Sequence, residues 1–273
     1  MKRDVSAEKE TLIKSPKSPR AIENELGDMI EFMVAQMGER FKNQVLGELQ
    51  ASTADKFADA QAGNFAAILL RLSRQVQKKL LKQFPDKRIE AMTSKMLGKL
   101  DSRSKQEFYA RVAKATGIDV TALIAKEGLK STTNALMLET AQWIKTLRDE
   151  TFQTFTNNTL FAMSQGDSLS SVVDQFDDIV KNRKNHAKFL ARNQVQNYNS
   201  ITTKVRAQNL GITKAVWETA GDERVRPSHA ARDGKEFDLA EGLYSSTDGV
   251  SLLPGADYNC RCGYRLVIPE TAD

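Results

Sequence analysis

The chain has 273 residues, of which 40 are Lys or Arg and 35 are Asp or Glu, and 40% of its residues are apolar. This composition supports a buried core and, with only two cysteines, excludes intrinsic disorder, collagen and small disulfide-rich scaffolds. The longest apolar run, residues 65–70, is far shorter than the roughly 20 residues of a membrane-spanning helix, so we expect no membrane span and one or two folded domains.

Residues 1–20 mix charged side chains with three serines and two prolines, a composition typical of a flexible arm. Charged residues follow Met1 directly, without the apolar region of a secretory signal. We therefore expect a protein of the reducing cytoplasm, where a disulfide is not the default state of the two cysteines.

Residues 21–170 form the predicted helical domain, because prolines are rare and apolar residues return every three or four positions. One apolar stripe, which contains several methionines, lies at residues 29–41. A second lies at residues 65–80, and Pro85 is expected to end its helix. A third stripe includes Trp143. We interpret all three stripes as faces that pack into the core.

Residues 171–273 form the predicted C-terminal module. It begins with a short helix and a basic helix, and the basic helix is expected to stop at Gly211, since glycine commonly follows the last turn of a helix. Segments 212–219 and 264–268 are rich in β-branched and aromatic residues, so we expect two strands that pair around a loop-rich stretch. The predicted fold class is therefore α+β, a mostly helical body followed by a small sheet-and-loop module.

Positive charge is concentrated in two segments of the chain. Residues 71–115 contain 13 basic and 4 acidic residues, and residues 181–206 contain 7 basic residues and no acidic one. Spacings of three and four residues place part of the second segment on one helix face. We define these residues as the basic stripe: Lys181, Lys184, Lys188 and Arg192. The stripe predicts binding to DNA or another polyanion, although a solvated helix face fits equally well because no aromatic stacking platform accompanies it.

The loop-rich stretch and its end contain both cysteines and one of the two histidines. Soft ligands concentrated in a small module suggest a structural zinc site with four ligands as one hypothesis. The predicted ligand set is His229, Asp233, Cys260 and Cys262. The two cysteines are closer in sequence than the usual zinc spacing, so two other interpretations stay open: packed reduced thiols beside a hydrogen-bonded histidine, and a disulfide.

A catalytic interpretation of the same stretch makes His229 a general base beside Asp222 or Asp233, with Arg224 and Arg226 holding a phosphate as in a nuclease. The stretch lacks a second histidine or a dense set of carboxylates, and polar clusters in loops often satisfy buried backbone groups. We therefore favour a structural role, in which Asp222 pairs with Arg224 or Arg226 and holds the turn.

The order of residues from residue 217 to residue 262 resembles the C-terminal signature of the minor head proteins of tailed bacteriophages, the head morphogenesis family typified by the Mu F protein. The residues that carry this resemblance are Trp217, Asp222, Arg224, Arg226, His229, Asp233, Gly234, Pro254, Gly255, Asn259, Cys260, Arg261 and Cys262. The resemblance begins near Val172 and covers about the last third of the chain. Asn193 and Gln194 stand where the family usually has Thr and Glu.

The resemblance implies a virion protein that is present in few copies inside the phage head and is assembled in the host cytoplasm. Its implied partners are the portal protein, the major capsid or scaffold protein, and packaged DNA. Contacts with DNA would be mostly to phosphates and therefore independent of base sequence. We interpret the polar cluster of this signature as structural, so we assign it no catalytic residues and expect a protein of assembly rather than an enzyme. Two alternatives stay open, a non-specific DNA-binding ejection protein and a metal-dependent nuclease.

Overall fold

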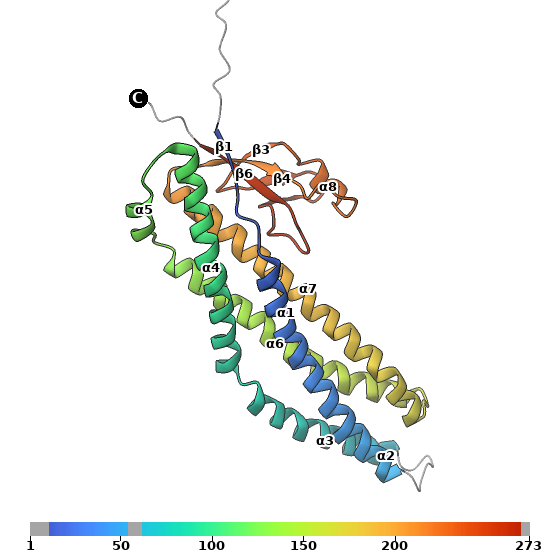
Figure 1. Ribbon diagram of the computed structural model, residues 1–273. Helices are drawn as coiled ribbons and strands as arrows, with labels where there is room; N and C mark the ends of the chain where they lie inside the picture. The colour runs from blue at the N-terminus through green and yellow to red at the C-terminus, as the bar shows by residue number, and fades with distance from the viewer. Residues whose placement is uncertain (1–10, 54–61, 269–273) are drawn as a thin grey trace, which may run out of the picture. The chain divides into compact units, whose positions relative to one another are not determined.

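The computed structural model describes residues 11–53 and 62–268, and most of these residues are helical (Figure 1). The helices are α1 (Arg20–Arg40), the π-helix η1 (Phe41–Leu46), α2 (Gly47–Thr53), α3 (Ala62–Gln83), α4 (Asp86–Thr116), α5 (Thr121–Ala125), α6 (Lys130–Ser164), α7 (Leu169–Asn209) and α8 (Pro227–Ala230). The strands are β1 (Thr11–Lys14), β2 (Lys214–Glu218), β3 (Glu236–Asp238), β4 (Leu243–Ser245), β5 (Val250–Leu252) and β6 (Gly263–Ile268). The predicted α+β class, a helical body followed by a small C-terminal sheet module, is confirmed.

The predicted apolar stripes lie mostly in the core. The apolar stripe of α3 is largely buried, and the helix ends at Gln83, just before Pro85. Trp143 in α6 is an exception, because 42% of its surface is exposed. The other residues of this predicted stripe are buried: Leu136, Ile144, Leu147 and Phe155. Trp143 directly precedes Ile144, and neighbouring residues of a helix point in different directions, so the two cannot both face the core fully.

Helix α7 is one continuous helix of 41 residues, where the sequence pattern predicted two. The segment contains neither glycine nor proline, so no residue in it breaks the backbone hydrogen bonds of a helix. The predicted stop is confirmed at Gly211, whose φ of 75° lies in the left-handed region that favours glycine. No helix in the described ranges is long and apolar enough to cross a bilayer.

Four strands form an antiparallel sheet in the order β1-β6-β2-β3, and β4 pairs with β5 in a separate sheet of two strands. The predicted pairing of the two C-terminal strands is confirmed, since β2 lies beside β6 with Trp217 opposite Tyr264. Alternate residues of this pair, among them Ala215 and Leu266, are fully or almost fully buried. One face of the sheet therefore carries the apolar core of the module.

The predicted flexible arm is wrong over its second half, and residues 1–10 lie outside the described residues. Strand β1 pairs with β6 along its whole length. Ile13 is 5% exposed, and the side-chain amide of Asn199 donates a hydrogen bond of 2.7 Å to the carbonyl oxygen of Pro16. Backbone pairing, an inward apolar side chain and side-chain donors from distant residues hold this segment, and none of these leaves a strong signal in composition.

The described chain forms two compact units whose segments alternate along the sequence. Unit 1 comprises Met1–Ile22, Leu97–Leu136 and Asn193–Asp273, and unit 2 comprises Glu23–Met96 and Met137–Arg192. These bounds differ from the contiguous domains predicted as residues 21–170 and 171–273. The reason is that α1, α4, α6 and α7 each contribute residues to both units.

Each unit has its own apolar core. In unit 1, residues of α4 and α7 pack with the buried face of the sheet, and Trp217 is completely buried there. In unit 2, four phenylalanines pack together: Phe41, Phe152, Phe155 and Phe176. The rings of Phe41 and Phe176 are stacked with centroids 5.3 Å apart.

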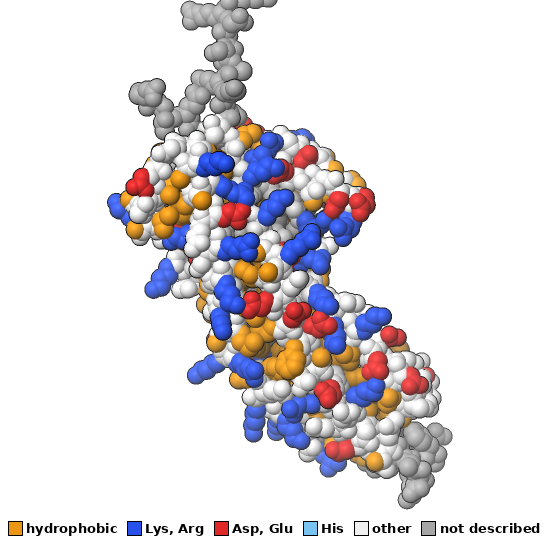
Figure 2. Space-filling model, viewed as in Figure 1, with side chains coloured by type: hydrophobic (Ala, Val, Ile, Leu, Met, Phe, Trp, Pro, Cys, Tyr) orange, Lys and Arg blue, Asp and Glu red, His pale blue; other side chains and the backbone are white. Residues whose placement is uncertain are grey.

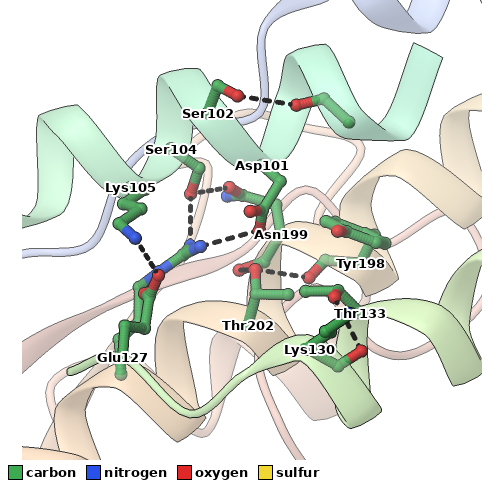
Figure 3. Close-up of polar contacts among 12 residues, drawn as sticks. Asp101, Ser102, Ser104, Lys105, Glu127, Lys130, Thr133, Tyr198, Asn199 and Thr202 are labelled. Carbon is green, nitrogen blue, oxygen red and sulfur yellow. Dashed lines mark hydrogen bonds and ion pairs between the residues drawn. The ribbon is translucent and has the colours of Figure 1, made fainter. Parts of the chain in front are cut away.

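A buried arginine joins three segments of unit 1. Arg206 of α7 is completely buried, and its guanidinium forms ion pairs with Asp101 of α4 at 2.7 Å and with Glu127 at 2.5 Å. Glu127 also pairs with Lys105 at 2.6 Å. Figure 3 shows Asp101, Ser104, Lys105 and Glu127 converging on this point. Because the charges are removed from water, each depends on its partners.

Replacing Arg206 with Leu is expected to lower the free energy of unfolding by roughly 3–5 kcal/mol, because Glu127 would keep a buried charge with fewer partners. The control is Lys214→Ala, which removes an exposed ion pair with Glu236 and should cost less than about 1 kcal/mol. Denaturant unfolding of the three proteins measures both values. Equal stability of the Arg206 variant and the parent would contradict this description of the unit 1 core.

Candidate functional site

The candidate site lies in the signature segment, defined as residues 219–262, between strands β2 and β6. Its histidine is placed by α8, which begins with Pro227 directly after the extended residue Arg226. Proline suits this first helical position because its fixed φ matches a helix and its missing N–H has no partner there. His229 is 2% exposed, and its ring meets the ring of Trp217 edge-on at 5.6 Å.

The two cysteines lie in an irregular turn immediately before β6. The turn includes Asn259, whose φ of 52° is in the left-handed region, and the Cys260 N–H donates to the carbonyl oxygen of Asp257 at 3.1 Å. This backbone path buries both side chains, with Cys260 4% and Cys262 7% exposed. Both are free thiols, so the disulfide interpretation is wrong for this structure.

His229, Cys260 and Cys262 form the cysteine–histidine cluster. The Nδ1 atom of the imidazole lies 3.5 Å from the Sγ of Cys260 and 3.6 Å from the Sγ of Cys262. All three potential ligand atoms lie within 4.8 Å of one another. Three of the four predicted metal ligands are therefore brought together by the fold.

Asp233, the fourth predicted ligand, does not join the cluster. It is exposed, and its Oδ1 accepts a hydrogen bond of 2.8 Å from the backbone N–H of Thr219. Asp233 thus satisfies a backbone group just after the end of β2. Short polar side chains commonly make such local backbone contacts, which is why sequence position alone was misleading.

Asp257 is the residue of the site that the sequence pattern did not reveal. Its Oδ2 lies 3.2 Å from the Nε2 of His229 and 2.7 Å from the Nη1 of Arg226. Arg226 also donates to the carbonyl oxygen of Tyr258. Asp257 is the only acidic residue between Pro254 and Cys262. Its position beside the two cysteines was the signal in the sequence that could have identified it as a partner of the histidine.

The contact between the two cysteines shifts their pKa values in opposite directions. Hydrogen bonding from Cys262 lowers the pKa of Cys260 to about 6, against the opposing effect of burial. The same contact and burial raise the pKa of Cys262 above its ordinary value. The Gly255 N–H also donates to the Cys260 Sγ at 3.3 Å. The cluster therefore favours one thiolate beside one thiol.

Asp222 holds the two ends of the signature segment together. Its carboxylate accepts two hydrogen bonds from Arg261, and its Oδ1 also accepts one from the Arg224 N–H at 3.2 Å. The Arg261 contact lowers the pKa of Asp222 to about 2. The predicted structural role of Asp222 agrees with this geometry, although its main partner is Arg261 rather than Arg224 or Arg226.

The predicted catalytic pairings of His229 are absent among the described residues. The carboxylate that contacts this imidazole belongs to Asp257, whereas Asp222 is engaged by Arg261 and Asp233 by a backbone group. Both nitrogens of His229 are already occupied by neighbouring side chains. The geometry therefore favours the structural interpretation over a general base.

Gly234 has a structural position in the signature segment. Its φ of 72° lies in the left-handed region, and its N–H donates to the Trp217 carbonyl oxygen at 2.9 Å. This bond closes the turn that leads from α8 into β3. A residue with a side chain would be strained at this φ, which accounts for glycine here.

A small pocket borders the cluster. It is lined by Ala220, Arg224, Val225, Arg226, His229, Asn259, Cys260, Arg261 and Cys262. The lining includes all three members of the cluster and three arginines but no acidic residue. Arg224 is the most accessible of these arginines, with 72% of its side chain exposed. The arrangement gives the buried sulfur and nitrogen atoms access to a small, cationic opening.

The basic stripe lies along α7 at the predicted helical spacing. Lys181, Lys188 and Arg192 are exposed and Lys184 is half-buried. One member is partly neutralised, since the Lys188 Nζ lies 2.9 Å from the Glu31 carboxylate. Figure 2 likewise shows basic side chains interspersed with acidic ones on the drawn face. DNA binding by the stripe stays a prediction.

Comparison with known proteins gives one family match. The family described as "Phage Mu protein F like protein" matches residues 153–265, a range that includes all of α7 and the signature segment. An "Uncharacterized protein" of Haemophilus influenzae is 30% identical over 221 residues, which cover 81% of this chain and 48% of that protein. No solved structure matches the chain.

A second relative has a named activity. The "NAD(+)--arginine ADP-ribosyltransferase EFV" of Enterococcus faecalis is 31% identical over 124 residues, which cover 42% of this chain and 26% of that protein. The chain therefore spans about half of one curated relative and about a quarter of the other. Helix α7 and the signature segment both lie within the region that matches this family. Residues 153–265 of the chain are therefore similar to the Mu F-like family, as the sequence resemblance predicted.

Burial of both thiols predicts slow chemical modification of the folded protein. Under native conditions, Cys260 and Cys262 should react with a disulfide reagent such as DTNB roughly 100-fold or more slowly than in denaturant, because reaction requires local opening. The release of the coloured thiolate measures both rates, with two thiols expected per unfolded chain. Native rates as fast as those of the unfolded chain would contradict the buried turn.

Proposed function

We propose that this protein is a minor capsid protein of a tailed bacteriophage that joins the procapsid through contacts with the portal and with coat or scaffold proteins. The observation that carries this proposal is the Mu F-like match over residues 153–265, which spans α7 and runs from the end of α6 into β6. In this role the signature segment is a rigid structural element. It would present the helical body to its assembly partners inside the head.

We further propose that the protein contacts packaged DNA through the basic stripe. The segment 181–206 has no acidic residue, and three of the four stripe side chains are exposed. Lys and Arg side chains at helical spacing bind phosphates without reading bases. Contact with the genome is compatible with a position inside the head, and the same surface would serve an ejection protein.

The nuclease alternative has weaker support. Both nitrogens of His229 have neighbours, and the pocket that borders it has no carboxylate among its lining residues. A general base needs a free acceptor within reach of the proton that it removes. The relative named as an ADP-ribosyltransferase matches over only 26% of its own length, so we do not extend its activity to this chain.

Co-purification from a phage-producing host tests the assembly role. The tagged chain should be recovered with the portal and coat proteins, and it should be present in purified procapsids in few copies. Gradient sedimentation followed by quantitative mass spectrometry measures its copy number per particle. Recovery of the chain free of both portal and coat proteins, with procapsids that lack it, would contradict the proposal.

Reversing charge on the basic stripe should weaken DNA binding. The triple variant Lys184→Glu, Lys188→Glu, Arg192→Glu is expected to lose roughly tenfold or more in affinity for double-stranded DNA, with a shallower dependence on salt, because phosphate contacts release counterions. Fluorescence anisotropy against a salt series measures both quantities. The control reverses exposed lysines elsewhere: Lys126, Lys130 and Lys235.

The charge-matched control separates a local contact from the net charge of the chain. The control variant changes total charge by the same amount as the stripe variant. If the stripe binds DNA specifically, the affinity of the control variant for DNA should fall much less than that of the stripe variant. Equal losses in the two variants would assign DNA binding to overall charge. An unchanged affinity in the stripe variant would remove the stripe as a DNA-binding surface.

A further inference from the structure

We propose that the protein binds one zinc ion through the Nδ1 of His229 and the Sγ atoms of Cys260 and Cys262. The fourth position of the ion would open into the pocket that these residues line. This site differs from the predicted four-residue set, because Asp233 is directed to the backbone instead. The proposal is independent of the assembly role, since it rests only on the cysteine–histidine cluster.

The distances within the cluster fit a tetrahedral zinc site. Zinc bonds of about 2.3 Å to sulfur and about 2.0–2.1 Å to nitrogen place the sulfur and nitrogen ligands about 3.5–3.6 Å apart at a tetrahedral angle. The observed separations of Nδ1 from the two sulfurs are 3.5 Å and 3.6 Å. All three atoms lie within 4.8 Å of one another, so the ligands need little movement to share one ion.

The carboxylate of Asp257 orients the imidazole for this role. A histidine that binds zinc usually donates its other ring N–H to a carboxylate, which fixes the tautomer and makes the ligating nitrogen more basic. Here the Nε2 of His229 lies 3.2 Å from the Asp257 Oδ2, which leaves the unprotonated Nδ1 directed at the sulfurs. Arg226 in turn holds Asp257 at 2.7 Å. Packed thiols alone do not require this chain of contacts.

The donor set selects zinc over the common hard cations. Thiolate and imidazole suit zinc, whereas magnesium and calcium take oxygen ligands. The Gly255 N–H donates to the Cys260 Sγ at 3.3 Å, a contact that suits a sulfur carrying negative charge. Gly255 has a φ of 86°, in the left-handed region that favours glycine, so this residue suits the backbone conformation that brings its N–H to the sulfur.

We expect that none of the residues that line the pocket supplies the fourth ligand of the zinc ion. Two thiolates neutralise the charge of the ion, and the pocket is lined by Arg224, Arg226 and Arg261 without an acidic residue. A water molecule or a small anion fits that environment. A site with three protein ligands and an open position is the arrangement found where zinc remains accessible to exchangeable ligands.

Metal analysis of the purified full chain tests the proposal. The protein should bind one zinc per chain after reconstitution and dialysis, as measured by inductively coupled plasma mass spectrometry. Cobalt in place of zinc should give thiolate-to-metal charge-transfer absorption and the visible bands of a tetrahedral site. Binding well below one equivalent, or cobalt spectra without thiolate bands, would overturn the proposal.

Variants locate the ion in the chain. Cys262→Ser should abolish the charge-transfer spectrum of a single stoichiometric site, and Asp257→Asn should weaken zinc binding by roughly 10–100-fold. Asp233→Asn is the matched control and should bind zinc as the parent does. If the cysteine variant fails to fold, the Asp257 and Asp233 variants decide. Full zinc binding by Asp257→Asn, or equal loss in Asp233→Asn, would contradict the assigned site.

Discussion

The C-terminal module depends on one carboxylate that holds two side chains at once. Asp257 lies 2.7 Å from Arg226 and 3.2 Å from His229, two residues that flank or belong to the short helix α8. Because α8 has only four residues, its own hydrogen bonds do little to fix its position. Asp257 therefore orients the imidazole toward Cys260 and Cys262 and joins the helix to the turn before β6.

The contacts around Asp257 and His229 connect both ends of the signature segment to each other and to the core. Arg261 stands between the two cysteines and reaches Asp222 at the start of the signature segment, so both ends of the segment are tied. Trp217 packs against His229 from the core side. The buried ion pairs of Arg206 play a corresponding role deeper in unit 1, where α7 meets α4. Paired polar groups thus hold the signature segment beside the apolar core of the sheet.

The sequence predicted what depends on local pattern. Periodicity identified the helices, β-branched residues identified β2 and β6, and Gly211 marked the end of α7. The sequence did not predict the features that depend on contacts between residues far apart in the chain. Strand β1 forms because its backbone pairs with the edge of β6. Asp257 belongs to the site because the fold brings it to His229, which is 28 residues away in sequence. Asp233 is nearer in sequence to His229 but serves the backbone of Thr219, and no spacing rule distinguishes the two.

The Mu F-like region thus combines a long helix that bears exposed positive charge with a polar module centred on His229. This combination is compatible with the proposed assembly role, in which the helix would meet partners and the module would keep its shape. The most direct test is an anomalous difference map at the zinc absorption edge from crystals of the full chain grown with zinc. We predict one peak between the His229 Nδ1 and the two sulfurs; density that shows the imidazole turned away from the cysteines, with no peak there, would contradict this account.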